Sequence, residues 1–413
     1  MMEDAAKEDA NDGELTAFSL PEEVEELVVP KKLEFAPWHK PRKQYVRKFQ
    51  WVHHARGVIN QLKQAGHLNH GAPLKYLTLP GPDLLDVRLL ADVCSTEDVP
   101  LQYTGFCHTS ESEAERLRRN IHQFSIDHEE RISKGSEVHP ARIEDVATRR
   151  SEAETLLQRN GPYDIINLDA CSPIANDNHE RTDRLIDAVR KIVEFQLNNS
   201  RKPWMLYLTT PFQTDSVSEQ SLEALHKQIT ENAENDEEFA AELSSQFQGE
   251  ETITEYLSRT AELNGIDFVT SATLGISKWF VHLASQANYS VKKMEGYCYS
   301  LFAEEPFEPN MISVCYLFLP DEIAIIDGTG LTPNEECEAG VAPISDHVRA
   351  LRRSLNLINL DDLLLAEAET RTSMIDETKD LLRNAGYNVD DPVDGYEAWL
   401  GNLPMEIAQA GAH

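Results

Sequence analysis

One short stretch of the chain contains the residues that are best placed to do chemistry. Ile165, Ile166 and Leu168 form an apolar run that is too short for an independent helix, and they indicate a buried strand ending at Asp169. Pro173 follows and cannot continue a strand ladder. Because ligands of open α/β sheets bind just outside the carboxyl ends of strands, Asp169 is predicted to meet a ligand. The alternative is that Asp169 only caps the next turn, since aspartate is common in turns.

Other catalytic and metal-binding patterns are absent from the sequence. The histidines show no tight metal-ligand spacing and no H-E-x-x-H motif, so a hydrolytic zinc site is not expected. There is no Walker loop and no G-x-S-x-G elbow. Cys171 has a nucleophilic thiol, but a small buried hydrophobe is the commoner role of such a cysteine.

A basic and aromatic segment lies near the N-terminus, between residues 31 and 56. The residues that suit phosphate contact and base stacking are Trp38, Lys40, Arg42, Lys43 and Arg47. A helix is predicted to begin near residue 44. The segment therefore predicts a local patch that binds a nucleic-acid substrate. The alternative is a solvated cationic helix that pairs with the protein's own acidic surface.

The overall charge sets limits on partners. The 413 residues carry a formal net charge of −33. A surface this acidic repels phosphate backbones at long range, which makes indiscriminate nucleic-acid binding unfavourable and fits a protein that docks on a basic protein partner. It leaves room for a local basic groove.

The cysteines and the hydropathy pattern predict a cytoplasmic protein without a membrane anchor. The six cysteines are scattered, form no C-x-x-C pair and fall partly in strand-like runs, which indicates reduced thiols. No run of about 18 or more apolar residues is present, so no transmembrane helix is expected. The acidic N-terminus lacks the basic and apolar regions of a secretory signal.

The elements that must position Asp169 follow a strand–helix rhythm. Strands are predicted at 74–79, 101–107, 138–143, 165–168 and 204–209, and helices are predicted between them. Such alternation implies an α/β fold with a doubly wound, mostly parallel sheet. The apolar runs at 290–302 and 311–319 indicate a closing antiparallel strand pair.

Composition changes along the chain predict its organisation. The predicted parts are a flexible acidic arm at 1–30, a basic-aromatic helical segment at 31–73, a Rossmann-like domain at 74–320 with an acidic helical insertion at 215–262, a linker at 321–344, and a C-terminal helical region at 345–413. No internal repeat is found.

The order of elements over about 60% of the chain resembles a class I S-adenosylmethionine-dependent methyltransferase. In motif style it is most similar to the tRNA guanine dimethyltransferases, whose sheet carries a comparable acidic strand end. The likeness is carried by four strand ends, which are Tyr76–Gly81, Tyr103–Cys107, Arg142–Asp145 and Asn167–Pro173. The resemblance implies S-adenosylmethionine as the cofactor, and catalytic roles for Asp169 and Pro173.

The resemblance also implies a set of cofactor-binding positions, of which only some match the family's pattern. These positions are Leu79, Gly81, Cys107, His108, Asp145 and Asp169. Asp145 matches the acid that faces the adenine amino group. The first turn keeps one glycine between two prolines, where the family has a glycine-rich turn, and Cys107 and His108 stand where the family has an acid for the ribose.

Three functions are compatible with these observations. The first is an S-adenosylmethionine-dependent methyltransferase that acts on or near nucleic acid. The second is a catalytically inactive scaffold of the same fold in a multi-protein assembly, such as a bacterial defence system, because the glycine turn is eroded. The third is an acidic decoy of nucleic acid, which the α/β core disfavours.

Overall fold

A computed structural model of the chain describes residues 33–69, 71–107, 113–128, 131–175, 184–214, 217–246, 255, 257, 265–300, 308–321 and 345–402. The chain divides into two compact units, Met1–Glu34 and Phe35–His413. The predicted arm at 1–30 and all but the first residue of the predicted linker at 321–344 lie outside the described residues. The basic segment, the sheet and the C-terminal helices all belong to the second unit from Phe35 onward.

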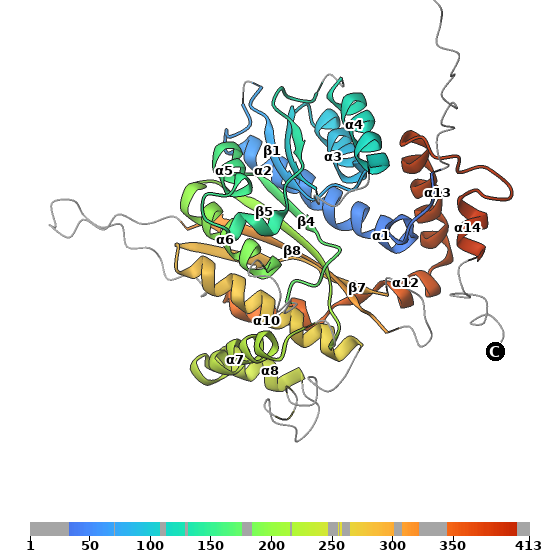
Figure 1. The fold of residues 1–413 in the computed structure, drawn as a ribbon. Coiled ribbons are helices and arrows are strands. Elements are labelled where there is room, and N and C mark those ends of the chain that lie inside the picture. Colours follow the sequence, from blue (N-terminus) through green and yellow to red (C-terminus); the bar gives the residue numbers. More distant parts are fainter. Residues whose placement is uncertain are drawn as a thin grey trace, which may run out of the picture. The chain divides into compact units, whose positions relative to one another are not determined.

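A nine-stranded mixed sheet forms the centre of this unit within the described residues (Figure 1). Its strands are β1 (Leu74–Thr78), β2 (Leu101–Phe106), β3 (Glu137–His139), β4 (Ile165–Asp169), β5 (Trp204–Pro211), β6 (Tyr289–Lys293), β7 (Tyr297–Tyr299), β8 (Met311–Pro320) and β9 (Ile358–Asn359). The order is β3-β2-β1-β4-β5-β8-β7-β9, and β6 also pairs with β8. The predicted α/β class with a mostly parallel sheet is confirmed.

The strand order reverses between β1 and β4, which places a topological switch point there. β1 pairs in parallel with β2 on one side and with β4 on the other, with Thr78 opposite both Gly105 and Asn167. The carboxyl ends of the parallel strands therefore meet at one edge. Ligands of open α/β sheets bind at this kind of position. The predicted antiparallel closure is also present, because β8 runs antiparallel to β5 and to β6.

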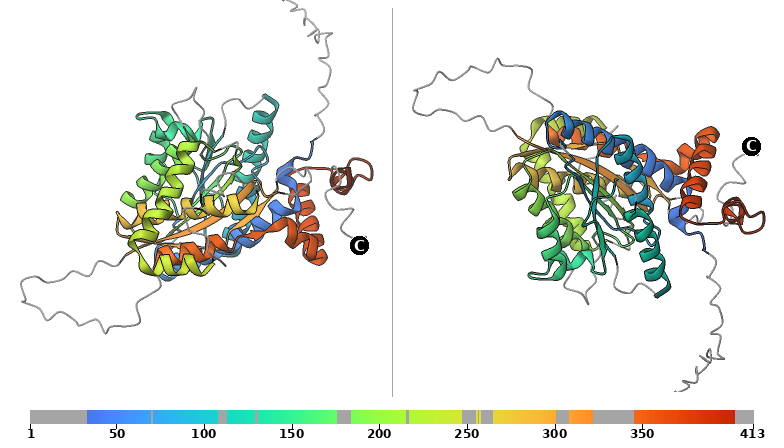
Figure 2. Two further views of the ribbon diagram at one scale, coloured as in Figure 1. Left: turned by 90° about the horizontal axis from the view of Figure 1, so that it is seen from below. Right: turned by 90° about the horizontal axis from the view of Figure 1, so that it is seen from above.

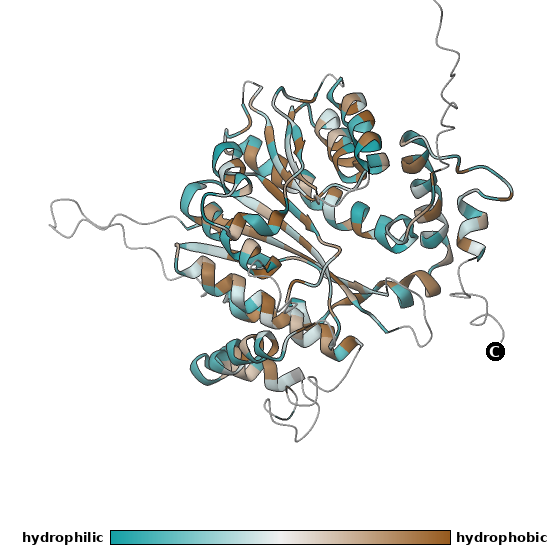
Figure 3. Ribbon diagram, viewed as in Figure 1, coloured by the Kyte–Doolittle hydropathy of each residue, from teal (hydrophilic) through white to brown (hydrophobic). Residues whose placement is uncertain are grey.

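Alternating side chains of the strands supply two separate hydrophobic cores, one on each face of the sheet. Leu77, Ile166 and Leu206 contribute to the core that packs against α5 (Glu152–Asn160), α6 (Leu185–Asn199) and α10 (Ile266–Ser285). Tyr76 and Ile165 contribute to the opposite core, with α2 (His53–Gln64) and α3 (Leu85–Thr96). Hydrophobic colouring follows the strands in Figure 3, and Figure 2 shows helices on both sides of the sheet. Each strand alternates because successive side chains point to opposite faces.

The basic segment forms a nearly continuous helical stretch before the sheet. It consists of η1 (Pro37–His39), α1 (Pro41–Val46), the π-helical η2 (Arg47–Val52) and α2. Pro41 occupies the first turn of α1, where its missing N–H is not needed. The helix begins earlier than residue 44, where the sequence predicted it.

Following β8 come α11 (Asp346–Leu355), α12 (Leu360–Ala366), α13 (Ala368–Asn384) and α14 (Tyr396–Asn402). Of these later helices, α11 packs against α10 and β6, and α13 packs against α1. Ser345 caps α11 by accepting a hydrogen bond from the Val348 amide. Two residues between α11 and α12 form β9, which pairs with β7. β9 was not predicted, because two residues carry no detectable alternation.

The acidic insertion is helical where it is described. α7 (Glu219–Asn235) and α8 (Glu237–Gln246) bury Leu225, Ile229 and Phe239 against α10 and α11. The remainder of the stretch 215–262 lies largely outside the described residues. No helix of the described chain combines the length and apolarity needed to cross a membrane.

One predicted strand is substantially different in the structure. The run 138–143 was predicted to be a strand, but β3 ends at His139, and residues Ile143–Ala147 form the 3-10 helix η3. Ser151 then caps α5 by accepting a hydrogen bond from the Glu154 amide. Polar Glu144 and Asp145 sit in the first turn of η3, so the apolar alternation that a longer strand needs is lost.

Candidate functional site

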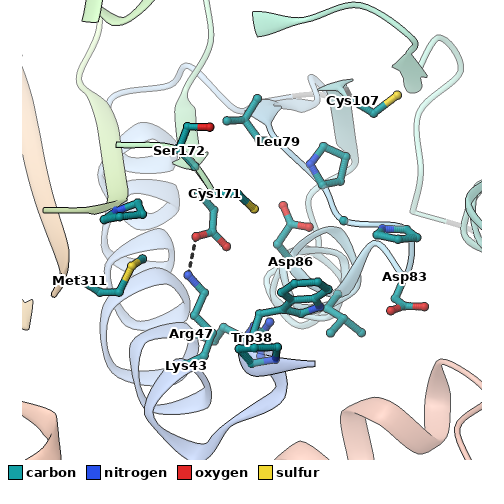
Figure 4. Close-up of a pocket in the computed structure, with 18 of the residues that line it drawn as sticks. Trp38, Lys43, Arg47, Leu79, Asp83, Asp86, Cys107, Cys171, Ser172 and Met311 are labelled. Carbon is teal, nitrogen blue, oxygen red and sulfur yellow. Dashed lines mark hydrogen bonds and ion pairs between the residues drawn. The ribbon is translucent and has the colours of Figure 1, made fainter. Parts of the chain in front are cut away.

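The carboxyl edge of the sheet opens into a cavity of about 660 Å³ (Figure 4). Its walls include the turn after β1, the end of β2, the start of η3 and the residues after β4. The opposite wall is made by the basic helical stretch, with Tyr299 and Met311 from β7 and β8. Its volume lies within the range of about 300–1,000 Å³ that is typical of small-molecule and cofactor sites.

The turn after β1 is tightly packed but poor in hydrogen-bond donors. Pro80 and Pro82 flank Gly81, and neither proline has a backbone N–H to offer a ligand. A Cβ atom on Gly81 would meet no atom within 4 Å, so the glycine leaves open space. In contrast, a Cβ on Gly105 of β2 would lie 3.0 Å from Cγ of Pro80, so this glycine permits close packing of the turn.

Asp169 at the end of β4 binds a cation from the opposite wall. The Lys43 Nζ atom of α1 donates a hydrogen bond to Asp169 Oδ1 at 2.5 Å. Burial lowers the pKa of Lys43, and the Asp169 carboxylate opposes this change. The Lys43 ammonium also lies 4.7 Å from the centre of the Trp51 ring. These contacts hold α1 against the strand end.

A second carboxylate, Asp86, also lines the cavity and was not singled out from the sequence. It lies in the first turn of α3, and its Oδ2 accepts hydrogen bonds from Tyr76 Oη at 2.9 Å and from Thr78 Oγ1. Burial raises the pKa of Asp86, and the negative charge of Asp169 adds to this effect. A carboxyl group with a raised pKa inside a cavity is typical of groups that exchange protons.

The basic residues of the opposite wall are buried. Exposed fractions are 5% for Lys40, 8% for Arg42, 4% for Lys43 and 4% for Arg47, whereas Trp38 is 43% exposed. Arg42 forms an ion pair with Asp361 of α12, just as Lys43 does with Asp169. These four cations therefore lie in the cavity wall and do not form an exposed surface patch. The alternative expected pairing with the protein's own carboxylates, and this pairing is present for Arg42 and Lys43, although the side chains are buried and not solvated.

A polar cluster around Asp83, which also lines the cavity, fixes the β1 turn. Asp83 follows Pro82, and its Oδ2 accepts a hydrogen bond from Tyr387 Oη at 2.8 Å. The guanidinium of Arg118 from α4 (Glu113–Asp127) pairs with the same carboxylate, and His122 Nε2 lies 3.4 Å from it. The cluster connects the turn to α4 and to the segment that follows α13.

The structure brings most of the predicted site residues together. Nine of them line this one cavity, namely Trp38, Lys40, Arg42, Lys43, Arg47, Leu79, Gly81, Cys107 and Asp169. Asp145 and Pro173 are not among the lining residues, and His108 lies outside the described residues. Cys107 donates its thiol to the His139 carbonyl oxygen at 3.3 Å.

Several lining residues were missed from the sequence. Glu144 lines the cavity where Asp145 was expected, because η3 turns the neighbouring side chain inward. Glu115 from the first turn of α4 also lines it. Cys171, for which burial was the commoner expectation, is exposed and lines the cavity. Among these residues, only Glu144 could have been found from the sequence, because it is next to the predicted residue Asp145.

The described residues contain no cluster of histidine, cysteine or acidic side chains that could hold a metal ion. The cavity is lined by carboxylates, cations and apolar side chains. The fold and the site define a doubly wound α/β protein with a ligand-sized cavity at its switch point.

Comparison with known proteins places the chain in one family. The chain belongs to the PP_RS20740-like family, whose model matches residues 32–401. A comparison with curated protein sequences finds no match. The matched residues include the basic helices, the sheet and the C-terminal helices.

Some solved structures are distantly similar. The CMeT domain of the citrinin polyketide synthase is 14% identical, with a TM-score of 0.31, and the match covers 66% of this chain and 52% of that one. The plantazolicin methyltransferase BpumL in complex with SAH is 12% identical, with a TM-score of 0.29 and coverages of 68% and 87%. This chain thus spans about half the length of the CMeT structure.

Proposed function

We propose that the protein binds S-adenosylmethionine in the cavity at the switch point and transfers its methyl group to a small acceptor. One observation carries the proposal: Leu79, Gly81, Cys107, Glu144 and Asp169, from four separate segments, line the same cavity. These segments follow β1, β2, β3 and β4 in a parallel sheet, where ligands of such sheets bind. The cavity is also large enough for a cofactor of this size.

The residues present fit the cofactor if two of the expected roles are taken by other residues. Glu144 takes the place expected for Asp145 as the acid that accepts a hydrogen bond from the adenine amino group. Glu115 supplies a carboxylate on the β2 side, where Cys107 cannot. Two orphaned buried donors, Arg47 Nε and Trp51 Nε1, lie on residues of the opposite wall and give the site unused hydrogen-bonding capacity.

The residues of the chain perform positioning and proton transfer in this proposal. S-adenosylmethionine supplies an electrophilic methyl group on its sulfonium. The Lys43–Asp169 pair fixes the helical wall against the strand end, so that the acceptor is held in line. Asp86, whose pKa is raised by burial, is the group that accepts the proton of the acceptor.

The acceptor in this proposal is a small molecule or a single side chain. A nucleic-acid acceptor, which the likeness to tRNA guanine dimethyltransferases implied, would need exposed cations along its backbone. Lys40, Arg42, Lys43 and Arg47 are instead buried in the cavity wall, and the chain carries a net charge of −33.

A catalytically inactive binding protein is the second candidate function. It is favoured by Pro80 and Pro82, which remove two amide donors from the turn where a cofactor would lie. Such a protein would bind S-adenosylmethionine but would not catalyse methyl transfer. Its distinguishing result is S-adenosylmethionine binding without methyl transfer to any carboxylate, amine or hydroxyl acceptor offered.

Isothermal titration calorimetry with S-adenosylhomocysteine tests the proposal. The expected dissociation constant is about 1 µM to 1 mM. Glu144→Gln is expected to weaken binding by about tenfold to a hundredfold, because the adenine amino group would then donate to a neutral amide oxygen instead of a carboxylate. The matched variant Asp145→Asn, one residue away and outside the cavity, is expected to bind as the wild type does. Absence of binding by the folded wild type would refute the proposal.

A further inference from the structure

Arg47 lines the cavity, and the proposed methyl transfer gives it no role in positioning or proton transfer. It begins η2, a π-helical segment that interrupts the α-helical stretch between α1 and α2. Such segments are often found at functional sites. Arg47 is only 4% exposed and lines the cavity beside Lys43 (Figure 4). Its charge therefore lies inside the protein and next to the space that a ligand would occupy.

The guanidinium of Arg47 has unused donors. Its Nε and Nη1 atoms are buried and have no hydrogen-bond partner among the described residues. Arg42 and Lys43, one turn earlier, form ion pairs with Asp361 and Asp169. A buried charge without a partner is strongly destabilising. Arg47 therefore differs from its neighbours, and a ligand anion would remove this cost.

The carboxylates near Arg47 are already engaged. Asp169 and Asp86 both act on the charge of Arg47, together with the hydroxyls of Tyr299 and Tyr396. Asp169 accepts a hydrogen bond from Lys43, however, and Asp86 accepts hydrogen bonds from Tyr76 and Thr78. No side chain of the described protein presents a carboxylate to the fork of Arg47.

We propose that Arg47 binds the carboxylate of a ligand inside the cavity. A guanidinium presents a planar fork of N–H donors that matches a carboxylate in a bidentate arrangement. This inference rests on the proposed function, in which two ligands enter the cavity. Either of them can supply the carboxylate. One source is the amino-acid end of the cofactor, because Pro80 and Pro82 remove two backbone donors from the β1 turn. The other is an acidic acceptor.

Binding to the wild type and to Arg47→Gln tests the inference with three probes. The probes are S-adenosylhomocysteine, 5′-methylthioadenosine, which lacks the amino-acid end, and benzoate, a small carboxylate. If the cofactor supplies the carboxylate, Arg47→Gln weakens S-adenosylhomocysteine binding about tenfold to a hundredfold and leaves methylthioadenosine binding unchanged. If the acceptor supplies it, both nucleosides bind normally and the rise in Tm with benzoate is lost.

Two controls keep the outcomes distinct. Arg47→Gln removes an unpaired buried charge, so it is expected to fold at least as stably as the wild type. Arg42→Gln breaks the ion pair with Asp361 and is expected to lower Tm. It is not expected to weaken the binding of the carboxylate-bearing probes selectively. Equal binding of all three probes by the wild type and Arg47→Gln would overturn the inference. Failure of both nucleosides with the wild type would instead refute the proposed function, while the benzoate comparison still tests Arg47.

Discussion

Lys43 and Asp169 are separated by 126 positions in the sequence, yet Lys43 Nζ lies 2.5 Å from Asp169 Oδ1. This contact joins the N-terminal helical stretch to the end of the strand that the sequence singled out. It makes the basic segment a wall of the cavity. The side chain of Lys43 is 5% exposed and that of Asp169 is 28% exposed, so the two partners depend on the contact unequally.

The unequal burial predicts unequal effects of the two single substitutions. Asp169→Asn leaves a buried ammonium without its counter-ion and is expected to reduce the free energy of unfolding by about 1–3 kcal/mol. Lys43→Met leaves a carboxylate that water still reaches, so its effect is expected to be smaller. Urea unfolding of both variants measures the difference.

The double variant provides the control for this pair. Asp169→Asn with Lys43→Met removes both charges, and its loss of stability is expected to be clearly smaller than the sum of the single losses. Additive losses, or a larger loss for Lys43→Met than for Asp169→Asn, would show that the contact does not connect the two elements in solution.

Gly81 in the β1 turn and Gly105 of β2, which packs against that turn, are expected to respond differently to substitution by alanine. A Cβ on Gly105 would lie 2.9 Å from Val138 Cγ2 and 3.0 Å from Pro80 Cγ, so Gly105→Ala is expected to cost about 1–3 kcal/mol through overpacking. Gly81→Ala meets nothing within 4 Å and is expected to change stability by about 0.5 kcal/mol or less.

The same two variants separate folding from binding. Because Gly81 lines the cavity, its added methyl is expected to weaken S-adenosylhomocysteine binding about tenfold at unchanged Tm. Calorimetry and thermal unfolding of each variant are the measurements. A stable Gly105→Ala protein, or unchanged affinity of Gly81→Ala, would contradict the described turn.

Lys293 is expected to make stability depend on pH. Burial lowers its pKa to about 7, with a smaller lowering by Arg353, while Cys315 opposes the change. From about pH 7 to its ordinary pKa of 10.5, the unfolded chain holds a proton on Lys293 that the folded chain has released. Unfolding then takes up a proton, so the contribution of Lys293 to the free energy of unfolding rises with pH.

Lys293→Met is expected to remove this dependence. It should stabilise the protein at pH 7 by about 1–4 kcal/mol and reduce the rise in stability between pH 7 and pH 9. Lys292→Met is the matched control, because Lys292 is the exposed neighbour in β6. The Tm of Lys292→Met, measured across this pH range, should change with pH as the Tm of the wild type does. An identical pH profile for all three proteins would refute the buried position of Lys293.

Cys171 reports on occupancy of the cavity. It is exposed and lines the cavity, whereas Cys94, Cys107, Cys298 and Cys315 are buried. In a Cys337→Ser background, iodoacetamide is expected to modify Cys171 first, and saturating S-adenosylhomocysteine is expected to slow the reaction. Peptide mass spectrometry over time measures both rates. Equal rates with and without the nucleoside would place the ligand elsewhere.

Much of the sheet could be predicted from the sequence because its strands are local patterns. The apolar runs of β1, β2, β4 and β5 identified the parallel core, and the abrupt end of β4 identified Asp169. After β3 the cavity is lined by Glu144 and not by the expected Asp145, because the side chain that a 3-10 turn points inward is set by backbone geometry.

The burial of the basic wall could not be predicted from local patterns. Lys43 and Arg42 look like surface residues in sequence, and their partners Asp169 and Asp361 lie far along the chain. Pairings of this kind are set by tertiary packing and leave no periodic signal. Tertiary packing also sets the contacts of Asp86. Its partners Tyr76 and Thr78 are close in sequence, but the hydrogen bonds form only because α3 packs beside β1.

A crystal structure of the full chain with S-adenosylhomocysteine tests the central claim most directly. We expect the nucleoside between the ends of β1, β2 and β4, with its adenine amino group within hydrogen-bond distance of Glu144 and its sulfur on the side of Asp169. A ligand bound outside this cavity, or an empty cavity in a crystal soaked at saturating nucleoside, would contradict the account.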